Sequence, residues 1–337
     1  MRLIKPYRIV IAIMLVVVAL SSCGSGAKSE YKSVEGCALG TFVQVVANTD
    51  RKPADIASMV EGVDAELKAS MSIFDDKSLL SQVNRGETDS LDVHIVRNIE
   101  IAARFTELSN GAYDVTVKPL TEAWGFANKE RDGVEPNVDS LLQFVGFDKI
   151  AVRDGVLLRS DERVQLDFNS VAKGYTVDIM AERLESMGIE DYLVNIGGEI
   201  RCKGENPKGD KWTIGVETPY DGNMEMDSYV KALQLSDCGL ATSGNYRRFY
   251  ETEDGRKVAH TIDPRTGYSV VSELLSATVV APTCAEADAA ATMFMALGSK
   301  GDALELAKRC EREYGWHYCF IYSNGDGYRV ECSEIFK

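Results

Sequence analysis

The stretch AEADAAATMF, residues 285–294, is alanine-rich and mainly apolar, which predicts a helix that faces the core of the protein. Before it, from Tyr192 to about Val280, the sequence predicts mainly strands, separated by Gly, Pro and Asp residues. After it, helix is expected to continue to residue 310, and two last strands are expected near 317–323 and 327–332. Runs of strands and pairs of helices therefore do not alternate regularly. This pattern favours an α+β fold over a parallel βαβ sheet.

The N-terminal half of the body adds further helices and short strands. A strand is expected over 38–47, and an amphipathic helix over 53–74, where Ile56, Val60 and Val63 recur at helical spacing. No G-x-G-x-x-G follows a strand, so the usual dinucleotide-binding fingerprint is absent from the sequence. No Pro/Gly-rich linker divides the body, which favours one unit of two lobes over two independent domains. Further helices are expected over 94–110, 137–145 and 169–188, and further strands over 148–152, 155–159 and 163–168.

The first 23 residues carry the pattern of a lipoprotein signal peptide. Arg2, Lys5 and Arg8 precede the twelve-residue apolar run IVIAIMLVVVAL. A helix of that length rises only about 18 Å, which is too short to span the hydrocarbon core of a bilayer. The run ends in LSSC, which resembles a bacterial lipobox, whereas a soluble secreted protein would show an A-x-A-like site. We therefore expect a signal peptide over 1–22, a flexible tether over 23–36 that begins at a lipid-bearing Cys23, and a folded body over 37–337.

The charge of the chain narrows the choice of partners. The formal net charge is −15, and the loss of three positive residues with the signal peptide leaves −18. Nucleic acid and anionic membrane surfaces are poor partners for such a body, so no nucleic-acid binding is expected. A phosphate-bearing ligand would need local help from a metal ion, a lysine or backbone N–H groups.

The chain has eight cysteines, and seven remain if Cys23 carries lipid. Seven is an odd number, so at least one thiol stays unpaired within the chain. No C-x-x-C or zinc-type spacing occurs. The expected compartment permits disulfides, but the sequence alone favours small, buried apolar side chains at these positions.

Asp288 and Thr292 stand at positions i and i+4 of the expected helix, so their side chains share one face. A carboxylate and a hydroxyl placed in this way can offer two oxygen ligands to a hard cation such as Mg²⁺. The alternative is a solvated aspartate and a threonine whose hydroxyl bonds back to its own helix. The spacing alone leaves both interpretations open.

A second polar stretch, LDFNSVAKGYTVD, covers residues 166–178. Asp167 is expected to end a strand, Asn169 or Ser170 to cap the following helix, and Lys173 to lie in its first turn. A lysine beside exposed N-terminal N–H groups would form a phosphate cradle, although the match to a P-loop is poor. The alternative is a plain capping site with a surface lysine. In the later VNIGGEI, Gly197 indicates close approach of the backbone to a ligand or to a neighbouring strand.

A third stretch places His260 within a dense polar turn, HTIDPRTG, residues 260–267. An imidazole in such surroundings is a candidate general base. The chain has three histidines. The other two, His94 at the start of a helix and His317 among aromatic residues, are expected to be structural.

At this point the motifs together resemble those of ApbE-type FAD:protein FMN transferases. Each motif alone is weak, but their combination and order are specific and cover most of residues 38–300. The motifs are LGT (39–41), MSIFDDKSLLSQVN (71–84), GAYDVTVKPLTEAWGF (111–126), LDFNSVAKGYTVD (166–178), VNIGGEI (194–200), ATSGNYRRF (241–249), HTIDPRTG (260–267) and AEADAAATMFMALG (285–298).

This resemblance implies an α+β fold related to the T-fold, with FAD bound between two lobes. It also implies a periplasmic lipoprotein of a bacterial membrane, in agreement with LSSC. In the family, an aspartate and a threonine of one helix bind Mg²⁺; here they would be Asp288 and Thr292, joined by the main-chain oxygen of Ser170. His260 matches the proposed base. FAD-binding positions would be Leu39, Phe74, Asp114, Val115, Thr116, Asp167, Lys173 and Ile262.

Two positions depart from the pattern of the family. Leu39 stands where methionine is common, and Asn169–Ser170 replace the small residues usual before AKG. The second change is expected to be tolerated, because the ligand there would be a backbone oxygen.

The implied reaction is the Mg²⁺-dependent transfer of FMN from FAD to a threonine hydroxyl of an acceptor protein, with release of AMP. Implied acceptors are subunits of membrane redox complexes and other extracytoplasmic flavoproteins. Two alternatives stay open. With water as the acceptor, the same site would be an FAD pyrophosphatase that yields FMN and AMP. A flavin-binding lipoprotein without catalysis would need Asp288 and Thr292 but would be indifferent to His260.

Overall fold

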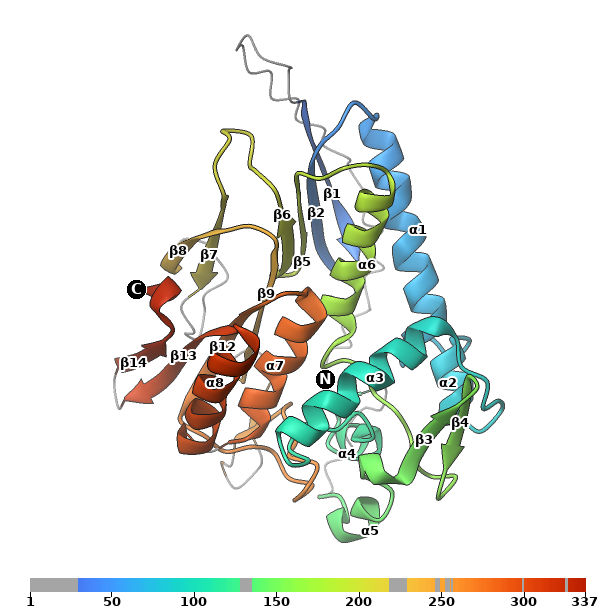
Figure 1. The fold of residues 1–337 in the computed structure, drawn as a ribbon. Coiled ribbons are helices and arrows are strands. Elements are labelled where there is room, and N and C mark those ends of the chain that lie inside the picture. Colours follow the sequence, from blue (N-terminus) through green and yellow to red (C-terminus); the bar gives the residue numbers. More distant parts are fainter. Residues whose placement is uncertain are drawn as a thin grey trace, which may run out of the picture.

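The computed structural model describes residues 30–127, 135–217, 229–245, 249–251, 255, 257–298, 300–324 and 327–337. An eight-stranded sheet with the order β1-β2-β5-β6-β9-β12-β13-β14 forms its centre (Figure 1). Every neighbouring pair in this sheet is antiparallel. The strands are β1 Tyr31–Ala38, β2 Thr41–Asn48, β5 Tyr192–Ile196, β6 Glu199–Lys203, β9 Cys238–Gly244, β12 Leu274–Ala281, β13 His317–Asn324 and β14 Gly327–Cys332.

One face of this sheet is covered by the long helices (Figure 1). Apolar side chains from helices and strands form one large core between them; Ile56, Phe105 and Phe294 come from helices, and Val45 and Ala277 from strands. Burial of these side chains is the main source of stability for such a layer. The helices are α1 Pro53–Met71, α3 Val93–Leu108, α6 Ala172–Ser186, α7 Cys284–Ala296 and α8 Lys300–Tyr314.

The opposite face of the sheet packs against a second apolar cluster. The hairpin of β7 (Trp212–Glu217) and β8 (Tyr229–Leu235) covers it, together with the short η2 helix (Glu334–Phe336). Sheet residues such as Ile200 and Leu240 point into this cluster. The middle of the sheet is therefore buried on both faces.

Shorter elements form the smaller lobe of the α+β fold. Its apolar cluster joins Leu120 and Trp124 to Val258 and Ile262, and the Trp124 indole N–H donates to the Gly267 carbonyl at 2.8 Å. The elements outside the main layers are α2 Leu79–Asn84, α4 Lys118–Ala123, α5 Val138–Leu142, η1 Phe147–Lys149, β3 Ile150–Arg153, β4 Val156–Arg159, β10 Phe249–Glu251 and β11 Lys257–Ala259.

The structure differs from the sequence-based prediction at three elements. The strand expected over 38–47 is two strands, because Leu39 and Gly40 take φ values of 50° and 73° and form a tight turn between β1 and β2. β1 begins at Tyr31, so the end of the predicted 23–36 tether belongs to the sheet. Residues 163–168 form no strand and make only an isolated bridge, from Gln165 to Val117.

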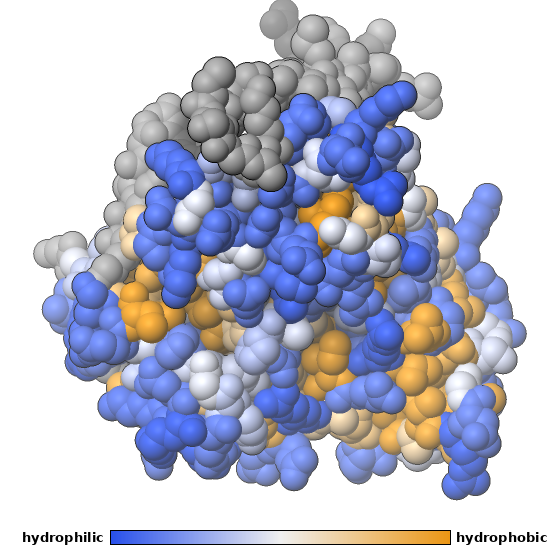
Figure 2. Space-filling model, turned by 45° about the horizontal axis from the view of Figure 1, so that its top comes forward, coloured by the Kyte–Doolittle hydropathy of each residue, from blue (hydrophilic) through white to orange (hydrophobic). Residues whose placement is uncertain are grey.

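The predicted signal peptide and Cys23 lie outside the described residues. Within the part of the chain that the structure describes, no helix is long and apolar enough to cross a membrane. The face shown in Figure 2 is mainly hydrophilic and carries separate hydrophobic patches. Most of the remaining cysteines are at least half-buried, as the sequence suggested, but Cys37 is exposed.

Candidate active site

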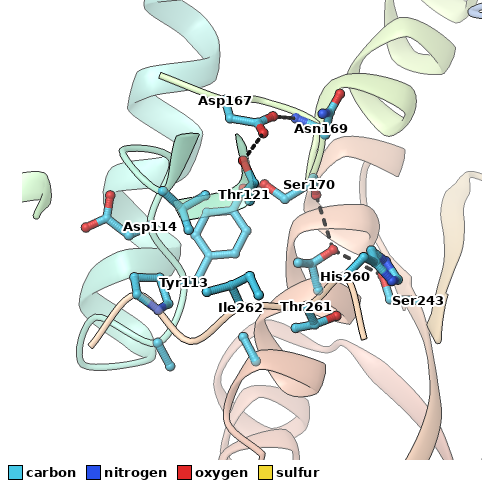
Figure 3. A pocket seen from close by; sticks show the side chains of 15 residues that line it. Tyr113, Asp114, Thr121, Asp167, Asn169, Ser170, Ser243, His260, Thr261 and Ile262 are labelled. Carbon is cyan, nitrogen blue, oxygen red and sulfur yellow. Dashed lines mark hydrogen bonds between the residues drawn. The ribbon is translucent and has the colours of Figure 1, made fainter. Parts of the chain in front are cut away.

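A pocket of about 130 Å³ lies where segments far apart in the sequence meet (Figure 3). The segment before α4 supplies Tyr113, the segment before α6 supplies Ser170, and α7 supplies Thr292. Six predicted site residues line this pocket together: Asp114, Asp167, Ser170, His260, Ile262 and Thr292. The other lining residues are Ala112, Tyr113, Val117, Thr121, Asn169, Ser243, Thr261, Pro264 and Ala296.

The start of α6 meets α7 at the predicted metal ligands. The Thr292 hydroxyl lies 3.5 Å from the carbonyl oxygen of Ser170, and its other neighbour is the Ser243 hydroxyl at 3.1 Å. One turn earlier on α7, Asp288 Oδ2 accepts the backbone N–H of Gly174 at 2.9 Å. Asp288 is only 4% exposed, so it is not the solvated aspartate that the sequence left open.

Charge is concentrated around Asp288. Burial and the nearby carboxylate of Glu199 raise the pKa of Asp288 to about 7, although Lys173 and Gly174 act in the other direction. Lys173 Nζ pairs with Glu199 Oε1 at 2.5 Å. Burial lowers the pKa of Lys173, but Glu199 and Asp288 outweigh it and raise the pKa. When Asp288 is ionised, two buried carboxylates and one ammonium group leave an excess of negative charge, which favours binding of a cation.

The predicted Mg²⁺ ligands form a donor set that fits a hard cation. It would combine one carboxylate, one hydroxyl and one main-chain carbonyl, all oxygen donors. No hydrogen bond from a described residue reaches Asp288 Oδ1, so this oxygen could face a cation. Groups of three or more His, Cys, Asp or Glu side chains that could hold a metal are absent from the described residues, so a site here would depend on Thr292 and Ser170.

The loop before α6 differs from the sequence-based expectation. The N-cap is Val171, with no side-chain capping bond, so neither Asn169 nor Ser170 caps the helix. The Asn169 N–H donates to Asp167 at 2.8 Å, and the Ser170 hydroxyl donates to the Tyr113 hydroxyl at 2.8 Å. The Ser170 hydroxyl thus bonds to a residue distant in sequence instead of capping the helix, while Lys173 does lie in the first turn as predicted.

Asp167 is 5% exposed and lines the pocket. It accepts the Thr121 hydroxyl at 3.2 Å in addition to the Asn169 N–H (Figure 3). Burial raises the pKa of Asp167, against these hydrogen bonds and the nearby Lys118. Through these hydrogen bonds, the Asp167 side chain fixes the conformation of the loop before α6 beside the pocket.

Asp114 has a structural role as well as a place in the pocket wall. Its carboxylate accepts the N–H and the hydroxyl of Thr116 at 2.8 and 2.7 Å and the Phe147 N–H at 2.7 Å. In Figure 3 it points away from the other labelled polar groups. The Val115 carbonyl accepts the Asp167 N–H at 2.8 Å. Val115 and Thr116 do not line the pocket themselves, but each is hydrogen-bonded to a residue that does, Asp167 and Asp114 respectively.

His260 follows β11 directly and borders the pocket beside Thr261 and Ile262 (Figure 3). The turn after it is held by the Asp263 carbonyl, which accepts the Gly267 N–H at 2.7 Å. Phe126 packs edge-on against the imidazole, with ring centroids 6.3 Å apart. The geometry supports a positioned imidazole at the rim of the pocket.

Six predicted site residues are not among those that line the pocket: Leu39, Phe74, Val115, Thr116, Lys173 and Asp288. Leu39 and Phe74 belong to other parts of the fold. Leu39 occupies the turn between β1 and β2, where its N–H donates to Asp64 at 2.7 Å. Phe74 follows α1 and is 60% exposed. Of the remaining histidines, His94 is buried and bonded to Tyr175 and Glu66, as expected for a structural residue.

Several residues that hold this site in place were not predicted from the sequence. Glu199 pairs with Lys173, and Tyr113 holds Ser170. Asp178 accepts the N–H groups of Cys284 and Ala285 at 2.9 and 2.8 Å and so binds the N-terminus of α7. These residues lie within or beside the quoted motifs, but their partners are far away in sequence.

An antiparallel sheet with helices on one face, and a pocket of hydroxyls, carboxylates and an imidazole against a smaller lobe, define an α+β ligand-binding protein. Residues 39–315 match the sequence model of the ApbE family, so the chain belongs to this family.

Similar proteins span nearly the same length. A "FAD:protein FMN transferase" of Haemophilus influenzae is 33% identical, over 98% of this chain and 97% of that protein. One of Vibrio cholerae is 31% identical, over 95% and 97%. Among solved structures, "Flavin Transferase ApbE from Vibrio cholerae" gives a TM-score of 0.80 at 28% identity, covering 92% of this chain and 99% of that one. The apo form of Pseudomonas stutzeri flavinyl transferase ApbE gives 0.80 at 27%, covering 91% and 95%.

Proposed function

We propose that this chain transfers FMN from FAD to a threonine hydroxyl of an acceptor protein, in a Mg²⁺-dependent reaction. The hydroxyl oxygen attacks the FMN-side phosphorus of the pyrophosphate, the bond from that phosphorus to the bridging oxygen breaks, and AMP leaves. The hydroxyl proton goes to a base on the enzyme. The product is FMN held by a phosphoester.

The names of the similar proteins support transfer of flavin from FAD to protein. The observation that carries the proposal for this chain is the meeting of α6 and α7. There the Thr292 hydroxyl and the Ser170 carbonyl are 3.5 Å apart, with buried Asp288 one helical turn away. These groups are the ones that the resemblance to the family implies as Mg²⁺ ligands.

In this proposal, Asp288, Thr292 and the Ser170 carbonyl would hold the metal ion. Once bound, the ion would stabilise the negative charge that develops on the phosphates. Lys173 adds a positive charge beside them, and Glu199 fixes the position of its ammonium group.

His260 accepts the proton of the attacking hydroxyl. A threonine hydroxyl is a weak nucleophile near neutral pH, so its proton must be removed as the bond to phosphorus forms. The imidazole borders the same pocket as Thr292 and Ser170. Proximity of the base to the metal ligands is what the reaction requires.

FAD would extend beyond this pocket, whose volume of about 130 Å³ is small for a dinucleotide. Asp167 and Ile262 would contact FAD at the pocket. Asp114 lines the pocket wall, and Val115 and Thr116 support this wall through hydrogen bonds to Asp167 and Asp114. We assign Leu39 and Phe74 to the outer part of the FAD site.

We also propose that the enzyme acts outside the cytoplasm of a bacterium, anchored to a membrane by lipid on Cys23. LSSC after the twelve-residue apolar run supports this assignment. The acceptors would then be threonine-bearing flavoprotein subunits of membrane redox complexes.

One experiment separates this function from the two alternatives. The purified full chain is incubated with FAD, with and without Mg²⁺ and with and without a candidate acceptor. Flavin fluorescence on the acceptor band of a denaturing gel, dependent on Mg²⁺, is expected. Release of FMN and AMP without a labelled acceptor would identify a pyrophosphatase, and FAD binding without either product would identify a carrier.

A further inference from the structure

Two pairs of cysteines face one another across neighbouring strands of the main sheet. Cys202 on β6 is the register partner of Cys238 on β9, and Cys319 on β13 is the register partner of Cys332 on β14. Directly opposed residues of an antiparallel pair have Cα atoms about 4.5–5.5 Å apart, within the span of a disulfide. Their side chains point to the same face, here the cluster under β7 and β8.

The thiols of the first pair differ in their surroundings. Cys202 is fully buried, whereas Cys238 is half-buried and borders a cavity of about 380 Å³. Arg201 and Lys211 lie near Cys238 and favour its thiolate, whereas burial and Asp237 act in the opposite direction. Cys202 has no such exposure to the cavity. The pair therefore combines a partly exposed cysteine at a cavity wall with a fully buried one.

We propose that Cys202 and Cys238 are a redox-active dithiol, which closes into a cross-strand disulfide by exchange with a small-molecule or protein disulfide. This site is separate from the transfer of FMN. We confine the proposal to this pair because Cys238 borders the cavity and has cationic neighbours.

The exchange balances in two steps. The Cys238 thiolate attacks one sulfur of the oxidant, a mixed disulfide forms, and the other sulfur of the oxidant leaves as a thiolate. Cys202 then loses its proton to solvent and attacks Cys238 Sγ, and the second thiolate of the oxidant leaves. Two protein thiols are oxidised, and one oxidant disulfide is reduced to two thiols.

The position of the bond gives it a structural effect. Cys202 and Cys238 flank residues 203–237, which include the β7–β8 hairpin that covers this face of the sheet. A disulfide would join the two ends of segment 203–237 and reduce the conformational freedom of this segment in the unfolded chain. Closing a loop of this length should raise the melting temperature by about 5 °C.

The full chain, purified in detergent, provides the first test. It is reduced, freed of reductant, exposed to oxidised glutathione and alkylated, and then digested without reductant by a glutamate-specific protease. Cleavage after glutamate places every cysteine in a different peptide. We expect peptide 200–205 joined to peptide 226–251, before any peptide that carries Cys284 or Cys310 is linked. Alkylation of both Cys202 and Cys238 after prolonged oxidation would overturn the proposal.

Two variants that cannot form the disulfide test whether Cys238 is the thiol that attacks the oxidant first. In Cys202→Ser, glutathione should remain attached to Cys238, because the resolving thiol is missing. In Cys238→Ser, buried Cys202 should stay unmodified, and the rise in melting temperature on oxidation should vanish. Cys37→Ser is the matched control at an exposed cysteine, and it should keep both the link and the rise. Glutathione on Cys202 in Cys238→Ser, with none on Cys238 in Cys202→Ser, would refute the assignment.

Discussion

At Gly174 the backbone of α6 packs directly against α7, and Gly174→Ala tests this contact. A Cβ atom at this position would lie 2.4 Å from the Cys284 carbonyl oxygen and 2.7 Å from Asp288 Cβ. Ordinary contacts of a Cβ atom are longer than 3.0 Å, so atoms must move. The nearest obstacle is backbone, which cannot turn away as a side chain can.

The expected cost follows from two opposing effects. Replacing a helical glycine by alanine favours the helix by about 1 kcal/mol. Overpacking a buried contact costs about 1–3 kcal/mol, and the backbone obstacle places this case at the upper end. We expect a net loss of about 2 kcal/mol in the free energy of unfolding, or a fall of about 4 °C in melting temperature. Separation of the helices should also weaken the bond from the Gly174 N–H to Asp288 and reduce transfer of FMN.

Thermal unfolding of the purified variant, followed by circular dichroism, measures this effect. Gly62→Ala is the matched control, because Gly62 lies in α1 and a Cβ there would meet nothing within 4 Å. The control should gain stability, by up to about 1 kcal/mol. A gain in both variants would refute the close packing of α6 on α7.

The remaining predictions concern the site, its pH dependence and the anchor. Asp288→Ala should abolish Mg²⁺-dependent transfer while FAD binding weakens less; full transfer at low Mg²⁺ would contradict the metal assignment. His260→Asn should lower transfer by about 10²–10⁴-fold with little change in FAD affinity, as expected for a general base, whereas a parallel loss of binding and melting temperature would indicate a structural role. Burial raises the pKa of Asp178 to about 6, so its contribution to stability is full below about pH 4 and is lost as pH rises to about 6. Asp178→Asn should therefore flatten the pH dependence of the melting temperature in that interval, and an unchanged slope would refute this. Cys23→Ala should release the protein from the membrane fraction; wild-type protein without lipid would contradict the anchor.

The sequence predicted elements whose pattern is local. The spacing of Ile56, Val60 and Val63 predicted α1, and all three are buried in the structure. Likewise, Asp288 and Thr292 share a helix as their spacing requires. The α+β class was predicted correctly from the order of such elements.

The partners of the site residues could not be read from spacing. Gly174 meets Asp288 across 114 positions, and Ser170 meets Thr292 across 122. The failed cap before α6 has the same cause, because Ser170 has a residue type suited to capping but bonds to Tyr113 instead. A motif supplies the chemical groups, while the packing of helices decides which of them meet.

This separation along the chain has a consequence for the order of folding. The tight β1–β2 turn joins neighbours in sequence and can form early, whereas the pocket needs residues from position 112 to position 296. β12, the strand before α7, pairs on one side with β13 near the end of the chain. Ligand binding should therefore emerge only after nearly the whole polypeptide has been synthesised. A truncated product that retains the first helices would have secondary structure without a binding site.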